Sequence, residues 1–250
     1  MAGSLEGRVA AITGASSGIG EATALAFARE GAAVALGARR EDRLEDLAKR
    51  IEADGGRALA LRADVADEDS AHAFVNGAHE RLGGLDILVN NAGVMLLGPV
   101  EGADTEHWRR MVDVNLLGLL YCTQASLPLM REGGGGHIVN VASVAGRIGS
   151  PGSAVYNLTK WGVVGFSEAL WKEAAPSNVR VTCVEPGFVD TELQGHNEHP
   201  MVKEAIEGMR NQIGEVLTAD DIAGAILYAV AAPPRVSIQE VLIRPTGQQR

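Results

Sequence analysis

The chain has 250 residues, of which 46% are hydrophobic and 22% are charged, and its formal net charge is −10 at pH 7. Length and composition fit a single globular α/β domain over residues 1–250, with a core large enough to bury most apolar side chains. The negative net charge excludes a nucleic-acid-binding surface, which needs a stripe of basic residues. The sequence also holds no run of eighteen apolar residues that could span a membrane. The first residues lack the apolar region of a signal peptide, so we expect a cytoplasmic protein.

The first predicted element is a buried strand over residues 8–13, followed by the turn Gly14-Ala-Ser-Ser-Gly18-Ile-Gly20 and a helix over 21–29. Strand, glycine-rich turn and helix in this order are typical of dinucleotide sites. The glycines let the backbone approach a pyrophosphate, and the helix N-terminus offers unpaired N–H groups. The alternative is a tight turn that only packs the helix against the sheet.

A second strand is predicted at 33–38, and Arg39 and Arg40 follow it where an acid would favour NAD. Arginine at this turn accommodates the extra phosphate of NADP, because guanidinium is a planar group with several donors that stays charged. The sequence therefore predicts NADP(H) as the cofactor. The alternative is that both arginines are solvated loop charges.

Seven apolar segments rich in Val, Ile and Leu alternate with helical patterns. They cover residues 8–13, 33–38, 57–62, 85–89, 137–142, 179–184 and 239–243. Such alternation predicts a Rossmann-like, doubly wound α/β/α sandwich with a seven-stranded parallel sheet. Strands that are apolar throughout fit a sheet covered on both faces.

Tyr156-Asn-Leu-Thr-Lys160 is the strongest candidate for chemistry, with Ser143 upstream. Residues at i and i+4 share a helix face, so the phenol and the ammonium can act together. A free tyrosine titrates near pH 10, and its pKa must fall to about 7 for acid–base work. Lys160 and a bound cationic nicotinamide supply attraction of that size. A packed Tyr beside a solvated Lys is the alternative.

The segment from about 188 to 214 follows the sixth strand and has weak periodicity until Met201. Its position, at the carboxyl ends of the strands, predicts a substrate loop, and a mobile surface loop is the alternative. We interpret His196 and His199 as polar loop residues and expect no metal site. Thr218-Ala-Asp-Asp221 has the spacing of a capping box, which predicts a helix start.

Together, these motifs resemble the classical short-chain dehydrogenases/reductases. The shared motifs are Thr13-Gly14-x3-Gly18-Ile-Gly20, Asn90-Asn-Ala-Gly93, Asn115, Ser143, Tyr156-x3-Lys160 and Pro186-Gly187 with Thr191. The resemblance covers essentially the whole chain and implies the strand order 3-2-1-4-5-6-7. Residues 91–100 and 243–246 further resemble the branch that contains clavulanic acid (clavaldehyde) dehydrogenase and short-chain 3-hydroxy acid dehydrogenases.

The resemblance also implies roles for individual residues. Tyr156 would protonate the substrate oxygen, Ser143 would hold it, Lys160 would bind the nicotinamide ribose, and Asn115 would position a water. The cofactor would contact Gly14, Ser16, Ser17, Gly18, Ile19, Gly20, Arg39, Arg40, Asp64, Val65, Asn91, Ala92, Gly93, Tyr156, Lys160, Pro186, Gly187, Val189 and Thr191. Arg39 would discriminate NADP from NAD, with Arg40 and Ser16 as helpers. Asn115 could instead bond its own helix backbone.

The implied activity is reversible reduction of a small-molecule carbonyl (aldehyde, ketone or 3-oxo acid) to an alcohol with NADPH. A 3-oxoacyl-carrier-protein reductase and a non-catalytic NADP-binding sensor are the alternatives. A sugar-nucleotide epimerase or dehydratase would need a longer chain. Apolar residues on more than one face of the helices near 104–131 and 151–174 predict a homotetramer, with a dimer as the fallback. Buried positions are predicted for Cys122 and Cys183.

Overall fold

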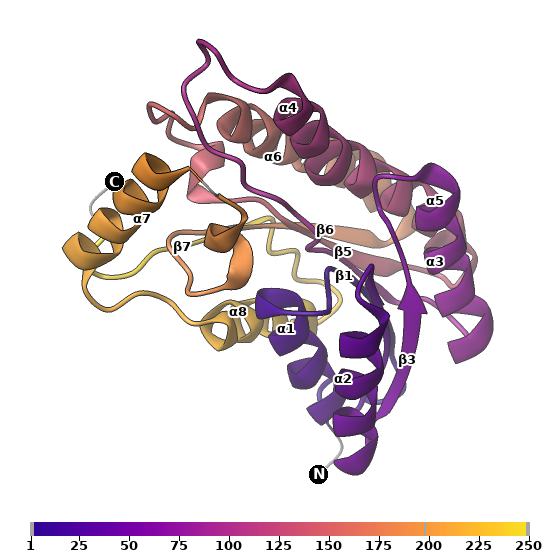
Figure 1. The fold of residues 1–250 in the computed structure, drawn as a ribbon. Helices are drawn as coiled ribbons and strands as arrows, with labels where there is room; N and C mark the ends of the chain where they lie inside the picture. The colour runs from indigo at the N-terminus through magenta and orange to yellow at the C-terminus, as the bar shows by residue number, and fades with distance from the viewer. Residues whose placement is uncertain (1–2, 198, 249–250) are drawn as a thin grey trace.

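One parallel sheet of seven strands organises the molecule (Figure 1). The structure is a computed structural model and describes residues 3–197 and 199–248. The strands are β1 (Val9–Thr13), β2 (Ala33–Ala38), β3 (Arg57–Arg62), β4 (Ile87–Asn90), β5 (Gly136–Val141), β6 (Val179–Pro186) and β7 (Glu240–Ile243). Their order is β3-β2-β1-β4-β5-β6-β7, which confirms the predicted Rossmann-like α/β fold. Residues 1–2 and 249–250 of the expected domain, and residue 198 of the expected substrate loop, lie outside the described residues.

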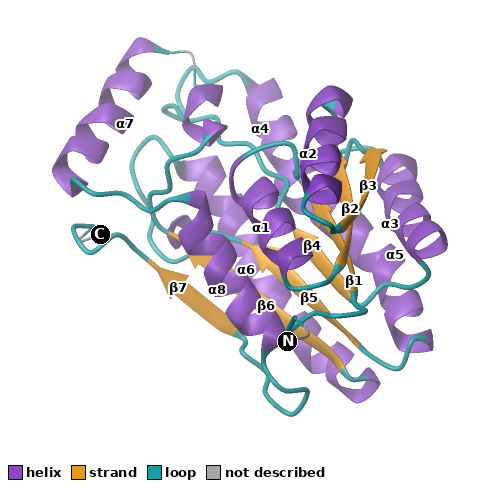
Figure 2. Ribbon diagram, turned by 90° about the horizontal axis from the view of Figure 1, so that it is seen from below, coloured by secondary structure: helices purple, strands orange, loops and turns teal. Residues whose placement is uncertain are grey.

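Helices cover both faces of the sheet (Figures 1 and 2). One face carries α1 (Gly18–Arg29), α2 (Glu41–Ala53) and α8 (Ala219–Ala231), and the other carries α3 (Glu68–Leu82), α5 (Gly118–Glu132) and α6 (Ala154–Ala174). Shorter elements are α4 (Thr105–Val112), the π-helix η1 (Asp113–Leu117), the 3-10 helices η2 (Val144–Gly146), η3 (Ala175–Ser177) and η4 (Glu192–His196), and α7 (Pro200–Ile213). Both views place α7 away from the two helical layers.

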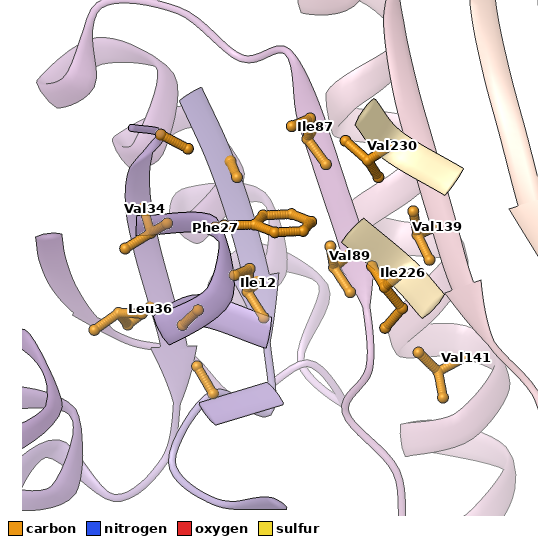
Figure 3. Packing of buried hydrophobic residues seen from close by; sticks show 14 of the residues in the cluster. Ile12, Phe27, Val34, Leu36, Ile87, Val89, Val139, Val141, Ile226 and Val230 are labelled. Carbon is orange, nitrogen blue, oxygen red and sulfur yellow. The ribbon is translucent and has the colours of Figure 1, made fainter. Parts of the chain in front are cut away.

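The packing on the two faces of the sheet explains why β1 and β2 carry apolar residues at successive positions. Ile12 of β1 packs with Phe27 of α1 and Ile226 of α8, as Figure 3 shows. Val9 and Ala11, at alternate positions of the same strand, belong to the cluster on the opposite face. Side chains alternate along a strand, so a sheet covered on both sides needs apolar residues at odd and even positions alike.

Two local predictions hold and one needs correction. Thr218 and Asp221 form the predicted capping box, in which each side chain bonds the other residue's backbone N–H. Cys122 and Cys183 are free and buried, as predicted. The helix expected near 104–131 instead consists of α4 and α5 with the π-helix η1 between them.

No helix among the described residues is long and apolar enough to cross a membrane. Within the same residues, no group of three or more His, Cys, Asp or Glu side chains is placed to hold a metal ion.

Candidate active site

A cleft of about 430 Å³ opens at the carboxyl ends of the central strands. This is the edge where ligands bind in open α/β sheets, and the volume is within the usual range for small-molecule sites. Of the residues predicted from the sequence, these line the cleft: Gly14, Ser16, Ser17, Gly18, Ile19, Arg39, Arg40, Asp64, Val65, Asn91, Ala92, Gly93, Ser143, Tyr156, Lys160, Pro186, Gly187, Val189 and Thr191. Gly20 and Asn115 are not among its lining residues.

Gly18 and Gly20 have different structural roles in the glycine-rich turn. Gly18 has φ +56°, a left-handed conformation that favours glycine. Gly20 lies behind the turn, where a Cβ atom would stand 2.4 Å from the carbonyl oxygen of Gly14. Gly20 is therefore closely packed within the turn, and its predicted contact with the cofactor stays a prediction.

Hydrogen bonds between β1 and the end of β4 fix this turn. The Thr13 hydroxyl accepts from the backbone N–H groups of Asn91 (3.0 Å) and Ala92 (3.1 Å). The Asn91 amide donates in return to the carbonyl oxygens of Thr13 (3.0 Å) and Gly14 (3.3 Å). Asn91 therefore supports the turn as well as lining the cleft.

Arg39 and Arg40 differ in their surroundings at the end of β2. Arg39 is exposed and lines the cleft. Arg40 donates to the hydroxyls of Ser16 (Nε 3.1 Å, Nη2 2.9 Å) and Ser17 (2.8 Å), and its Nη1 pairs with Glu192 at 2.7 Å. The guanidinium of Arg40 is thus held against the glycine-rich turn.

Tyr156 and Lys160 lie on α6 and are both buried. The Lys160 ammonium is 5.8 Å from the centre of the Tyr156 ring and donates to the carbonyl oxygen of Val141 at 2.9 Å. Ser143 comes from the end of β5, and its hydroxyl accepts from the N–H of Ala145 at 3.1 Å. The structure therefore brings the phenol, the ammonium and the serine hydroxyl to one wall of the cleft.

Burial controls the pKa values of this group. Burial raises the pKa of Tyr156 to about 12, although a hydrogen bond with Ser143 opposes it. Burial lowers the pKa of Lys160 to about 8. The prediction of a pKa near 7 included the charge of a bound cationic nicotinamide and stays a prediction, while the cost of burying a phenolate is a contribution that sequence reasoning did not weigh. A phenol with this pKa is protonated at neutral pH and can serve as an acid.

Asn115 lies in η1 behind the cleft and is buried. Its amide oxygen accepts from the N–H of Val94 at 2.8 Å, and its amide nitrogen donates to the Val94 carbonyl (2.9 Å) and the Thr159 hydroxyl (3.2 Å). The hydrogen bonds reach another segment and α6, so the alternative of bonding to its own helix is wrong. Asn115 joins the loop after β4 to the helix that carries Tyr156.

The loop after β6 crosses the cleft and is anchored on its far side by Asn197. The Asn197 amide oxygen accepts from the N–H of Leu97 at 2.7 Å, and its nitrogen donates to the Met95 carbonyl at 3.1 Å. On the near side, a Cβ atom at Gly18 would lie 3.1 Å from Thr191 Cγ2. Residues 191–197 therefore contact both walls, and helix α7 follows.

A buried ion pair holds the segment after Ser143. Arg147 donates to both carboxylate oxygens of Glu185 (2.6 and 2.7 Å) and pairs with Glu240 at 2.7 Å. These bonds raise the pKa of Arg147 above its ordinary value. Because Glu185 is fully buried on β6, the arginine ties the Ser143 segment to the sheet.

The cleft also contains residues that sequence reasoning did not assign to the cofactor or substrate. These are Gly37, Ala38, Ala63, Val94, Arg110, Val114, Val141, Ala142, Glu192, Leu193, Gln194 and His196, of which the last four lie within the predicted substrate loop. Burial and the nearby Arg110, Arg39 and Arg40 lower the pKa of His196. Arg110 and Val114 are four positions apart, a helical spacing that could have indicated a shared face, whereas the irregular loop gave no signal for Glu192.

The donor groups of this cleft fit a dinucleotide. Ser17 is the N-cap of α1 but makes no side-chain cap bond, which leaves the first N–H groups of the helix to meet an anion. Arg39 and Arg40 lie beyond the same turn and offer guanidinium groups to a further phosphate. These residues suit an anionic dinucleotide.

Comparison with known proteins agrees with this geometry. A sequence model of the short chain dehydrogenase family matches residues 8–201. Glycine betaine reductase ATRR of Emericella nidulans is 42% identical over 98% of the chain, which spans 19% of that relative's length. An oxidoreductase of Staphylococcus saprophyticus is 41% identical, with 96% of this chain and 97% of the relative aligned.

Solved structures show the same fold. An alcohol dehydrogenase from Thermococcus sibiricus, complexed with 5-hydroxy-NADP, aligns over 97% of this chain and 98% of its own, with a TM-score of 0.86 and 32% identity. A 7α-hydroxysteroid dehydrogenase complexed with NADH and 7-oxo glycochenodeoxycholic acid aligns over 98% and 96%, with a TM-score of 0.89 and 29% identity. The finer branch expected from residues 91–100 and 243–246 stays a prediction.

Proposed function

Because the chain belongs to the short-chain dehydrogenase family, we propose that it is an NADPH-dependent oxidoreductase that reversibly reduces a carbonyl compound to an alcohol. The observation that carries the proposal is the convergence of Tyr156, Lys160 and Ser143 in one cleft with Arg39 and Arg40. In this proposal residues 1–250 act as one catalytic domain, and a cytoplasmic location stays a prediction.

Each catalytic side chain has a defined role in the proposed reaction. Bound NADPH supplies a hydride to the carbonyl carbon. Tyr156 donates its phenolic proton to the carbonyl oxygen, and Ser143 donates a hydrogen bond to the same oxygen. Lys160 stabilises the phenolate that remains and binds the ribose hydroxyls. Asn115 holds the backbone at Val94 and, we propose, positions the water that returns a proton.

The remaining site residues hold the cofactor. Gly14, Ser16, Ser17, Gly18 and Ile19 surround the pyrophosphate, and Gly20 packs the turn. Asp64 and Val65 meet the adenine, Asn91, Ala92 and Gly93 line its ribose, and Pro186, Gly187, Val189 and Thr191 meet the nicotinamide. Arg39 binds the 2′-phosphate, with Arg40 and Ser16 as helpers.

The substrate is proposed to be a small aldehyde, ketone or 3-oxo acid. Apolar residues surround Tyr156, including Val94, Met95 and Trp108, so the carbonyl can carry an apolar substituent. The alternative of a carrier-protein reductase would need a basic docking patch near the cleft mouth. Arg147 is occupied by two carboxylates, and Arg131 lies before β5, at the opposite edge of the sheet. Neither arginine supports that alternative.

We expect purified protein to reduce members of a panel of aldehydes, β-keto acids and 3-oxoacyl thioesters, with a higher kcat/KM for NADPH than for NADH. Arg39→Asp should reverse the cofactor preference, because a carboxylate repels the 2′-phosphate and accepts a hydrogen bond from the 2′-hydroxyl. Arg235→Asp makes the same charge change in the exposed loop before β7 and should leave the preference unchanged. NADH used as well as NADPH by the wild type would contradict the cofactor assignment, and no turnover with any substrate would favour the sensor.

We also expect a homotetramer. Leu158 and Trp161 on α6 are 61% and 51% exposed, and Tyr228 on α8 and Leu242 on β7 are 71% and 48% exposed. These two apolar surfaces fit two isologous interfaces. Met111, Leu119 and Leu170 of the same helical segments are instead buried in the core.

Light scattering at micromolar concentration should give about four times the 26.1 kDa chain mass. Trp161→Glu should lower the mass to that of a dimer. A wild-type mass near one chain would contradict both the tetramer and the dimer.

A further inference from the structure

A carboxylate from the loop after β6 occupies the arginines at the end of β2. Glu192 Oε2 accepts from Arg40 Nη1 at 2.7 Å, and Glu192 Oε1 accepts from Arg43 Nη1 at 2.6 Å. Each oxygen thus has its own guanidinium. The two arginines lie 152 and 149 positions away in the sequence, so the pairing is a product of the fold.

The bridge crosses the cofactor cleft. Arg40 also donates to the hydroxyls of Ser16 and Ser17 in the glycine-rich turn, and Glu192 lines the same cleft. Thr191, next to Glu192, approaches Gly18 of that turn. The carboxylate therefore lies inside the region that a bound dinucleotide must share.

Glu192 remains negatively charged at working pH. Hydrogen bonds from Arg43 and Arg40 lower the pKa of its carboxyl to about 2, although its side chain is half exposed. A phosphate that approaches Arg40 would meet this charge on the same donors. Two anions compete for one guanidinium, because each repels the other and the hydrogen-bond donors are few.

We propose that Glu192 is a residue that sets cofactor specificity by competing with the 2′-phosphate for Arg40, which lines the cleft. The inference rests on the proposed NADPH function. Arg39 and Arg40 favour the phosphorylated cofactor, and Glu192 weakens that preference. Since Glu192 belongs to the loop that crosses the cleft, the competition also links the adenosine end of the site to the substrate side.

The test is calorimetric titration of the full chain with adenosine 2′,5′-bisphosphate and adenosine 5′-monophosphate. Glu192→Gln keeps the shape of the side chain and removes its charge. We expect it to bind the bisphosphate about three- to five-fold more tightly than the wild type, the upper part of the range given by exposed ion pairs, with unchanged affinity for the monophosphate. Asp190→Asn is the matched control, because Asp190 lies on the same loop as Glu192 and pairs with Arg210 of α7 but does not line the cleft. It should bind both nucleotides as the wild type does.

A second variant tests whether the gain in bisphosphate affinity depends on Arg40. In an Arg40→Gln background, Glu192→Gln should bring a smaller gain or none, because the shared donor is missing. An unchanged or weaker bisphosphate affinity in Glu192→Gln alone would overturn the inference, as would an equal gain with Asp190→Asn. The proposed function is judged separately, by the wild-type preference for NADPH over NADH. Even if that preference were absent, the ratio of bisphosphate to monophosphate affinity must rise in Glu192→Gln for this inference to stand.

Discussion

Tyr156→Phe is expected to lower kcat for carbonyl reduction by about 10²- to 10⁴-fold, the contribution of a positioned general acid. The substitution removes one hydroxyl and keeps the ring that packs with Val94 and Met111. Cofactor binding should therefore remain near the wild-type value. Stopped-flow or steady-state assays of NADPH oxidation measure the first quantity, and fluorescence titration with NADPH measures the second.

Tyr121→Phe is a matched control for this variant. Tyr121 is a partly buried tyrosine on α5 whose ring meets that of His72 and which does not line the cleft. It should keep most of the wild-type rate. If Tyr156→Phe retained more than about a tenth of the rate, Tyr156 could not be the proton donor.

The sequence predicted the fold well because the decisive signals are local. Each strand is a short apolar run, and two helical layers require that pattern on both faces. The capping box at Thr218 needs only residues three positions apart. The π-helix at 113–117 was not predictable in this way, since it is associated with distant contacts. Asn115 in that segment bonds Val94 and Thr159, and a Cβ atom at Gly118 would lie 2.7 Å from Val65.

The candidate site also has parts that local sequence motifs predict and parts that depend on distant contacts. Tyr156, Lys160 and the glycine-rich turn are short motifs, and all three line the cleft apart from Ala15 and Gly20 of the turn. Glu192 reaches its arginine partners only because β2 and β6 both end at this edge of the sheet. The pKa of Tyr156 depends on how much protein surrounds the phenol, which a motif does not specify.

Lys160→Met is expected to lower kcat/KM by about 10²- to 10³-fold, because it removes the positive charge nearest the phenol. It should also weaken NADPH binding by at least about ten-fold, through the loss of charged hydrogen bonds to the ribose. The ammonium is mostly charged at neutral pH, since burial lowers its pKa only to about 8.

The pH dependence gives the sharper test of Lys160. A positive charge favours the phenolate and lowers the pKa of Tyr156, so its removal must raise that pKa. In the direction of alcohol oxidation, where Tyr156 has to accept a proton, the rising limb of kcat/KM should move upward by about one to three pH units. Lys160→Arg keeps the charge and should restore part of the profile, and Lys172→Met, on the exposed face of the same helix, should change nothing. A pH profile of Lys160→Met that overlaid the wild type would show that Lys160 does not act on the phenol, and cofactor binding would be its only remaining role.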